Sequence, residues 1–206
     1  MSNVFDIFPV PLYRSVLDID TSALNNYKKN MYEVGTGAGM TQESPPRILE
    51  KPDLKHIKSE VLNHFRTFMY NYMGVPDQTD AAITTSWIVS LKKNGYIHLH
   101  KHTNCWFSGL LYFEDDYTDA VALDLRNLQQ NNSAYCVDSQ RYRSDSVVSI
   151  APEKNLLIFF PSYIEHGSEI HTADKTRWSL AFNFFPIGKI GEITQDSYID
   201  TAWLNS

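Results

Sequence analysis

Histidines recur at alternate positions in one short segment of this chain. His98, His100 and His102 all lie between Tyr96 and Thr103. Residues two apart on a strand point to the same face, with Cβ atoms roughly 6.5–7 Å apart. Two imidazoles at that spacing can bind one metal ion through bonds of about 2.0–2.1 Å. All three would span about 13 Å, so at most two should be ligands unless the strand breaks.

A third ligand must come from elsewhere, and His166 is the best candidate. It follows Phe159-Phe160-Pro161-Ser162, a strand-like apolar run that ends in a proline turn. The alternating segment 177–183 lies beyond it. The spacing alone leaves a second interpretation open, in which the His-x-His pair is the solvated face of a strand. His171 is expected to be a surface residue without a role.

The composition fits a single domain that can hold such a site. The 206 residues are 43% hydrophobic and 20% charged, which favours a folded core over disorder. A net charge of -6 argues against a nucleic-acid binder with a broad basic face. The longest apolar run has five residues, 156–160, whereas a membrane span needs about 20. Neither a signal peptide nor a disulfide framework is predicted, so we expect a cytoplasmic protein with reduced Cys105 and Cys136.

The elements that must position these residues come in the order helices, then strands. We expect a helix from Asp20–Ser22 to about Tyr32, and a clear amphipathic helix opening at Pro52 and ending at Gly74–Pro76. Asn94-Gly95 predicts a hairpin turn. Strands are predicted at 83–91, 96–102, 106–113, 120–125, 146–150, 155–161, 165–171 and 177–185. The chain is therefore predicted to be α+β, mainly β, with a sandwich or barrel core.

Five short segments in order carry a family resemblance. They are Phe8-Pro9-Val10-Pro11-Leu12, His100-Lys101-His102, Ser108-Gly109-Leu110-Leu111-Tyr112, Phe160-Pro161-Ser162-Tyr163-Ile164-Glu165-His166 and Arg177-Trp178-Ser179-Leu180-Ala181-Phe182-Asn183. This order resembles a family of 2-oxoglutarate/Fe(II) oxygenases of bacteria and tailed phages, especially phages of cyanobacteria. The resemblance covers nearly the whole chain from Phe8 to Phe185.

The resemblance implies a double-stranded β-helix (jelly roll) with N-terminal supporting helices and a metal at one mouth of the barrel. The second family histidine lies six residues before the Ser-Gly pair, which selects His100 and His102, with His166 as the third metal ligand and catalytic residue. His98 with His100 is the fallback pair. A third imidazole stands where the broader superfamily has a carboxylate. Glu165 is expected to point away from the metal, because it neighbours His166 on a strand.

The resemblance also implies a site for 2-oxoglutarate, the co-substrate, beside Fe(II). Arg177 would bind the far carboxylate bidentately, and Ser179 would add a hydroxyl from the same strand face. Tyr112 either donates its hydroxyl to the co-substrate or is a packed tyrosine of the core. Trp87 and Asn104 are further pocket candidates. Asn155 stands where the family usually has a glycine turn, and asparagine tolerates the same left-handed backbone.

The predicted organisation is one oxygenase domain over residues 1–206. Its helical part covers about 20–75, its jelly-roll core about 81–186 and its tail 187–206. The long polar segment 115–146 either shapes a substrate site or is an insertion without catalytic use. The predicted reaction couples oxidative decarboxylation of 2-oxoglutarate to hydroxylation by dioxygen of an unknown small-molecule or protein substrate.

Two alternatives stay open from the sequence alone. One is a three-His cupin-like metalloenzyme that does not use 2-oxoglutarate, and the other is a non-catalytic jelly-roll binding module. If a phage encodes the chain, its expected location is the cytoplasm of the host. The sequence gives no indication of oligomeric state.

Overall fold

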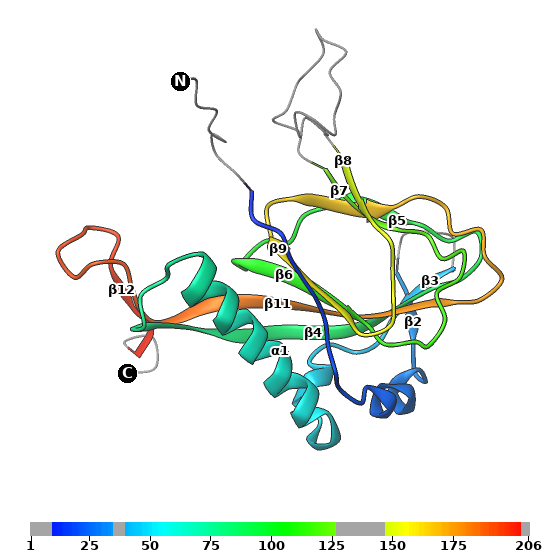
Figure 1. The fold of residues 1–206 in the computed structure, drawn as a ribbon, viewed down its shortest axis with the longest axis horizontal. Coiled ribbons are helices and arrows are strands. Elements are labelled where there is room, and N and C mark those ends of the chain that lie inside the picture. The colour runs from blue at the N-terminus through cyan, green and yellow to red at the C-terminus, as the bar shows by residue number, and fades with distance from the viewer. Residues whose placement is uncertain (1–9, 35–39, 127–146, 203–206) are drawn as a thin grey trace, which may run out of the picture.

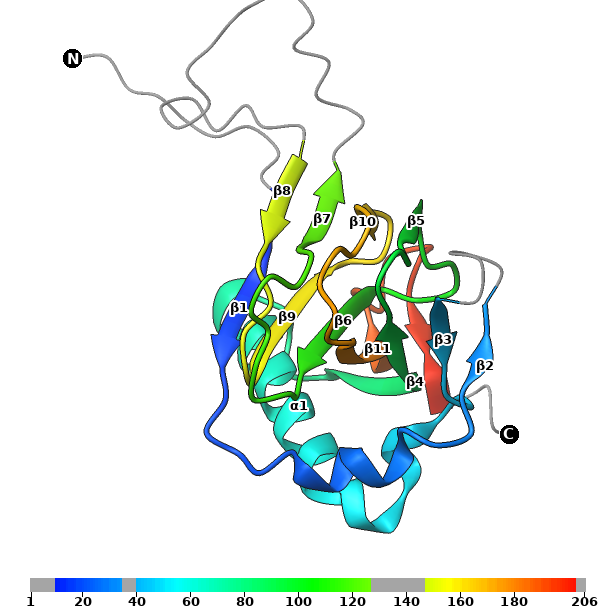
Figure 2. The same ribbon diagram turned by 90° about the vertical axis from the view of Figure 1, so that its right-hand side faces the viewer.

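A computed structural model describes residues 10–34, 40–126 and 147–202 of the chain. Two antiparallel sheets face each other, the smaller above the larger (Figure 2). The larger sheet has the order β1 (Tyr13–Val16), β9 (Leu156–Pro161), β6 (Phe107–Tyr112), β11 (Arg177–Ile190), β4 (Thr79–Leu91), β3 (Thr41–Glu43) and β2 (Tyr32–Glu33), and β12 (Ile199–Asp200) pairs with β11. The smaller sheet has the order β5 (Ile97–His100), β10 (Glu165–Ser168), β7 (Leu123–Arg126) and β8 (Val147–Ile150). The predicted mainly-β jelly roll is confirmed.

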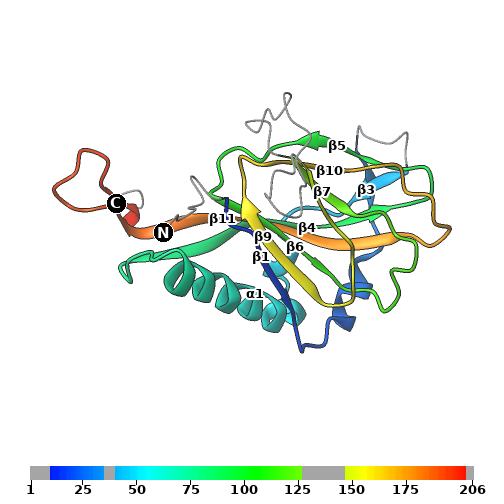
Figure 3. The ribbon, with the colours of Figure 1, turned by 45° about the horizontal axis from the view of Figure 1, so that its top comes forward.

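One long helix covers the outer face of the larger sheet. This helix, α1 (Lys55–Thr67), runs beside β4 and β11 in two views (Figures 1 and 3). The 3-10 turn η3 (Pro52–Leu54) leads directly into α1, and the π-helical turn η4 (Phe68–Tyr72) continues it. Two further 3-10 helices, η1 (Ser22–Tyr27) and η2 (Ile48–Glu50), lie earlier in the chain. The helix predicted from Pro52 is therefore confirmed, with 3-10 and π turns at its ends. Within the described residues, no helix is both long and apolar enough to cross a membrane.

The helix predicted from Asp20 to Tyr32 was wrong in type and length. Only the six-residue 3-10 helix η1 forms there, and Tyr32 already belongs to strand β2. The left-handed backbone of Asn30, with φ at 63°, turns the chain out of the helical path. The segment 20–75 therefore contains two strands of the larger sheet, β2 and β3, besides its helices.

The apolar residues form two clusters, one on each face of the larger sheet. Phe65 of α1 stacks on Phe184 of β11 with ring centroids 3.8 Å apart, in the cluster between helix and sheet. The second cluster fills the space between the two sheets and includes Leu110, Ile158 and Leu125. Strand alternation produces this division, because successive side chains of β6 and β9 point to opposite layers. The larger sheet is thus buried on both faces over its central strands.

The turn at Asn94-Gly95 forms, but the hairpin predicted from it does not. Asn94 has the left-handed φ of 68° that such a turn requires. The strands on either side join different sheets, since β4 pairs with β11 and β5 pairs with β10. The turn thus carries the chain from the larger to the smaller sheet. It also delivers the His-bearing strand β5 to the position opposite β11.

His171 stabilises that turn and is buried, so its prediction as a surface residue was wrong. The backbone N–H of Asn94 donates to the carbonyl of His171, and the N–H of His171 donates to the carbonyl of Gly95. The imidazole Nε2 lies 2.7 Å from the carbonyl oxygen of Lys175. The imidazole Nδ1 accepts the backbone N–H of Val121, 50 residues earlier in the chain, and a contact between such distant segments cannot be recognised from the sequence neighbours of His171.

Candidate active site

Three imidazoles come together where β5 and β10 meet. The structure brings the ligand atoms of His100, His102 and His166 within 4.8 Å of one another. His166 is buried on β10, and its register partner on β5 is the exposed His100. The Nε2 atoms of His102 and His166 are 3.1 Å apart. The structure thus assembles the three histidines that the sequence singled out.

The strand breaks between His100 and His102. Strand β5 ends at His100, and the backbone N–H of His102 donates to the carbonyl of Ser162 on the turn after β9. The expectation that both histidines lie on one regular strand was therefore wrong. The change of direction lets the ring of His102 approach that of His166, with centroids 4.9 Å apart.

Backbone carbonyls orient two of these imidazoles. Nδ1 of His100 lies 2.7 Å from the carbonyl oxygen of His98, and Nδ1 of His166 lies 3.1 Å from that of Ile164. A proton held at Nδ1 by a carbonyl leaves Nε2 with its lone pair free. This arrangement is the usual one for metal-ligating histidines, whose other ring nitrogen donates to a backbone or carboxylate oxygen.

The surroundings favour neutral rings. Burial lowers the pKa of His102 to about 4, and the charge of His100 adds to the effect. Burial likewise lowers the pKa of His166 to about 3, with His100 as the second cause. Neutral imidazole is the form that binds metal ions. Both rings are therefore ready to act as ligands at neutral pH without first losing a proton.

The distances fit one metal ion. Ligands at adjacent corners of an octahedron with bonds of about 2.1 Å lie roughly 3 Å apart. The 3.1 Å between Nε2 of His102 and Nε2 of His166 matches this separation. His100 is exposed, so its ring has room to turn toward the other two. A three-His face of this kind leaves several positions around the ion for other ligands.

His98, the alternative to His102 in the fallback pair, and Glu165 lie outside this group. The exposed His98 has its Nε2 3.3 Å from the hydroxyl of Tyr96. Glu165 points away from the imidazoles and lies 3.7 Å from the amino group of Lys101. Among the described residues, the set that could hold a metal comprises His100, His102 and His166.

A buried network of three motif residues supports the histidines. Ser108 lies on β6, Ser162 follows β9 and Asn183 lies on β11. The Ser108 hydroxyl lies 2.9 Å from that of Ser162 and donates to Oδ1 of Asn183 at 2.8 Å. Ser162 in turn accepts the backbone N–H of His102. Their role was not predicted from the sequence, although polar side chains within otherwise apolar strands were the available signal.

A cavity of about 240 Å³ opens beside the imidazoles. Its lining includes all three histidines together with Arg177, Ser179 and Trp87. The alternation predicted for β11 is confirmed, because Leu180 and Phe182 pack in the layer next to α1 while Arg177 and Ser179 line the cavity. Asn104 is exposed and does not belong to this lining, which corrects its prediction as a pocket residue.

The Arg177 guanidinium is buried, with only 3% of the residue exposed. Its Nη1 donates to the carbonyls of Val121 and Ala122 at 3.1 and 3.4 Å. These bonds fix the planar group, and no ion pair to a carboxylate is present among the described residues. A buried positive charge without a counter-ion is costly, so this position favours an anionic ligand.

Tyr112 lies against that guanidinium and is completely buried. The Arg177 carbon Cζ is 5.4 Å from the centroid of the tyrosine ring. The Tyr112 hydroxyl has no hydrogen-bond partner within the described structure. Burial raises the pKa of this hydroxyl, so it is a donor at neutral pH. Ser179 is its register partner on β11, which places both hydroxyl-bearing residues at the same level of the sheet.

Several sequence expectations fall partly or wholly on residues that the structure does not describe. Residues 127–146 of the polar segment lie outside the described ranges, as does Cys136. The predicted left-handed turn at Asn155 is confirmed by a φ of 59°. Its side-chain amide donates to the carbonyls of Leu17 and Ile19, so the start of β9 is hydrogen-bonded to the segment that follows β1.

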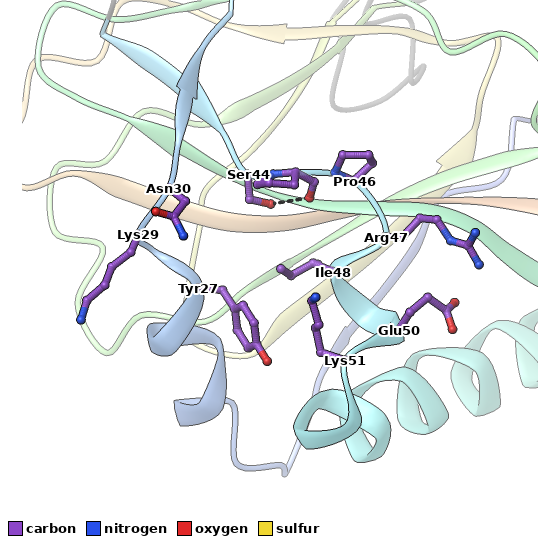
Figure 4. Close-up of a pocket in the computed structure, with 10 residues that line it drawn as sticks. Tyr27, Lys29, Asn30, Ser44, Pro46, Arg47, Ile48, Glu50 and Lys51 are labelled. Atoms are coloured by element: carbon purple, nitrogen blue, oxygen red, sulfur yellow. Dashed lines mark hydrogen bonds between the residues drawn. The ribbon is translucent and has the colours of Figure 1, made fainter.

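A second and larger concavity, of about 430 Å³, lies outside the two sheets, around η1 and η2. Figure 4 shows Lys29 and Arg47 extending away from it, while Lys51 points up between Tyr27 and Ile48. Its charged side chains do not converge on a common point, in contrast to the imidazoles. The cavity between the sheets is therefore the candidate active site.

The fold and this site define a jelly-roll protein with a three-His candidate metal centre beside a buried arginine. Residues 85–183 match the sequence model of a family described as "Putative 2OG-Fe(II) oxygenase". Over this segment, which is just under half of the chain, the sequence is similar to that of the 2-oxoglutarate/Fe(II) oxygenases, enzymes of the oxidoreductase class. No curated protein sequence matches it.

Three solved structures illustrate the similarity of fold. HygX from Streptomyces hygroscopicus, solved with nickel and 2-oxoglutarate bound, superposes with a TM-score of 0.59 at 9% identity over 93% of this chain and 92% of its own. The α-ketoglutarate-dependent carbocyclase SnoK from nogalamycin biosynthesis gives 0.58 at 12% identity, over 91% and 85%. A Pseudomonas putida prolyl-4-hydroxylase gives 0.56 at 12% identity, over 85% and 92%. At these identities the likeness concerns the fold.

Proposed function

We propose that His100, His102 and His166 hold the Fe(II) of this oxygenase, and that Arg177, Ser179 and Tyr112 hold its 2-oxoglutarate. The observation that carries the proposal is the convergence of three imidazoles, two of them oriented by backbone carbonyls, and a buried, unpaired guanidinium on one cavity. When bound, the metal and co-substrate supply an oxidant through oxidative decarboxylation of 2-oxoglutarate. The proposed outcome is hydroxylation of an organic substrate by dioxygen.

The chain's own residues would bind the metal ion and the co-substrate and hold them in a fixed orientation. The carbonyls of His98 and Ile164 hold two imidazoles with Nε2 toward the metal position. Imidazole ligands carry no negative charge, so an ion held by three of them would keep its full positive charge and would attract an anionic co-substrate more strongly. The apolar side chains Leu110 and Leu123 are buried and form an apolar part of the cavity wall.

The opposite wall supplies the groups for a carboxylate. A guanidinium held by two carbonyls is pre-organised, and its remaining N–H groups can bind a carboxylate bidentately. The Tyr112 hydroxyl would gain in the complex the partner that it lacks in the free protein. Ser179, buried on the cavity lining, would add a further donor.

The alternatives raised from the sequence receive less support. A three-His enzyme that needs no 2-oxoglutarate leaves a buried arginine without a function, and the family match also argues against a binding module without catalysis. One oxygenase domain over 1–206, with its core at about 81–186 and its tail at 187–206, is our proposal for the chain's organisation. A location in the cytoplasm, that of the host if the gene belongs to a phage, stays a prediction.

Anaerobic titration tests the proposal directly. Fe(II)-loaded protein should develop a weak visible charge-transfer band as 2-oxoglutarate is added. Arg177→Ala should weaken co-substrate binding by more than about tenfold, because a charge-assisted bidentate contact is lost. The conservative Arg177→Lys variant should recover only part of it, since lysine lacks the planar fork. If no band forms with the wild-type protein, the proposed co-substrate site is wrong.

A further inference from the structure

One acidic residue of the cavity lining has no part in the proposed metal or co-substrate sites. Glu43 ends β3 and lines the cavity together with Trp87 and the histidines. It is the one carboxylate in that lining, as far as the described chain extends. No lysine, arginine or histidine of the described residues forms an ion pair with the Glu43 carboxylate. A half-buried carboxylate without a cation is therefore available to a ligand.

The sheet register locates Glu43 relative to the co-substrate groups. Glu43 pairs with Val89, Val89 pairs with Ser179, and Ser179 pairs with Tyr112. These four residues form one row across β3, β4, β11 and β6. Glu43 lies two strands from Ser179, a separation of roughly 10 Å. The cavity thus has an anionic end and a cationic end on the same sheet, with the imidazoles facing them from the smaller sheet.

Trp87 connects Glu43 to the metal side. The indole ring lies 5.6 Å from that of His102, centroid to centroid, and borders the same cavity. Burial raises the pKa of the Glu43 carboxyl, while hydrogen bonding from Trp87 and the charge of His100 lower it. The pKa of Glu43 is raised overall, which means that Trp87 and His100 do not compensate for the hydration that the carboxylate loses on burial. A bound cation would supply that compensation, and an indole beside it adds a favourable cation–π contact.

We propose that Glu43, with Trp87 beside it, binds a positively charged group of the organic substrate, a protonated amine or a guanidinium. The inference rests on the proposed function, since it takes the Arg177 end of the cavity to be filled by 2-oxoglutarate. A substrate held at Glu43 lies next to the ring of Trp87 and hence next to His102. Glu43 is then a specificity-determining residue that selects cationic substrates and positions a nearby carbon at the metal.

Binding of simple probes tests the charge preference. The probes are n-pentylammonium, the neutral 1-hexanol and the anion hexanoate. Their binding to protein loaded with Ni(II) and 2-oxoglutarate is measured by ligand-observed NMR. We expect pentylammonium to bind at least about tenfold more tightly than 1-hexanol, as a charge-assisted contact in a partly buried site predicts. Hexanoate should bind more weakly than either.

Two substitutions make the result specific. Glu43→Gln keeps the size of the side chain and an acceptor for Trp87, and it should reduce the preference to within about twofold. Glu33→Gln removes the same charge from the exposed neighbouring strand β2 and should change nothing. Both variants should bind 2-oxoglutarate like the wild type.

Two outcomes overturn the inference. One is equal or tighter binding of 1-hexanol by the wild type, and the other is an undiminished preference in Glu43→Gln. Failure of the proposed function would look different, because the wild-type protein would then fail to bind 2-oxoglutarate in the separate titration. The two failures are therefore distinguishable on one preparation.

Discussion

His166 lies directly opposite His100 in the register between β10 and β5. The next residue, Gly167, packs against the backbone of β5: a Cβ placed there would lie 2.6 Å from the carbonyl oxygen of Ile97 and 3.1 Å from the carbonyl of His98. The two histidines can approach one another only because position 167 has no side chain. The register of two short strands thus sets one edge of the candidate metal centre.

Substituting Gly167 should therefore damage the metal site before it damages the fold. Gly167→Ala forces β10 away from β5, because the obstructing atoms belong to the backbone and cannot rotate aside. We expect Ni(II) or Co(II) affinity to fall at least about tenfold in calorimetric titration, because metal ligands that lose their support bind the ion less tightly. Glu169→Ala, an exposed change just beyond β10, serves as the control. Unchanged metal affinity in Gly167→Ala would contradict the close packing as a requirement.

The metal affinities of single histidine variants should distinguish the metal ligands from the histidine that only lies near them. His100→Gln, His102→Gln and His166→Gln should each lower divalent-metal affinity by more than about 100-fold, because each removes one of only three protein ligands. His98→Gln should leave the affinity within about threefold of wild type, since its ring faces Tyr96. A large loss in His98→Gln with little loss in His102→Gln would instead support the fallback pair.

Tyr112→Phe should have opposite effects on folding and on binding. The hydroxyl is buried without a partner, so its removal should leave the free energy of unfolding unchanged or raise it by about 1 kcal/mol. The same change should weaken 2-oxoglutarate binding severalfold, because a donor to the co-substrate is lost. Denaturant unfolding without ligands and the anaerobic titration measure the two effects. A destabilised variant with normal co-substrate affinity would show that Tyr112 is only a packing residue.

Metal-free protein should lose stability as the pH falls below about 6.5. Burial depresses the pKa of His102 to about 4 and that of His166 to about 3 in the folded state. The unfolded chain, whose histidines titrate near 6.5, therefore binds more protons between these values, and acid favours unfolding. At pH 5 this costs up to roughly 2 kcal/mol per histidine.

Urea unfolding at pH 7 and pH 5, after chelation, measures this loss. The His102→Gln/His166→Gln double variant is the matched control and should show a smaller decrease, since neither glutamine titrates. An equal decrease in both proteins would mean that other groups cause the acid sensitivity.

Much of this site was predictable from residue types and local spacing. Arg177 and Ser179 were placed on a polar inner face by the alternation of their strand, which a period of two makes visible. His166 was identified through its position after a buried strand and a proline turn. These inferences succeed because they depend on a few neighbouring residues.

The remaining features depend on contacts between distant segments. His102 leaves the strand because its backbone N–H bonds to Ser162, 60 residues later in the chain. The turn at Asn94-Gly95 was recognised, but not that its flanking strands join different sheets. Glu43 lies on a three-residue strand, too short for a periodic signal. Only the register with β4 brings its carboxylate to the cavity.

The candidate metal ligands belong to the smaller sheet and its adjoining turn, whereas the arginine, serine and tyrosine for the co-substrate belong to the larger one. The distance between the two groups is consequently set by the apolar side chains packed between the sheets, among them Leu110 and Ile158. Repacking that layer could misalign iron and substrate while every ligand still binds. An enzyme altered in this way would consume 2-oxoglutarate without product, a fault that inspection of its ligands alone would miss.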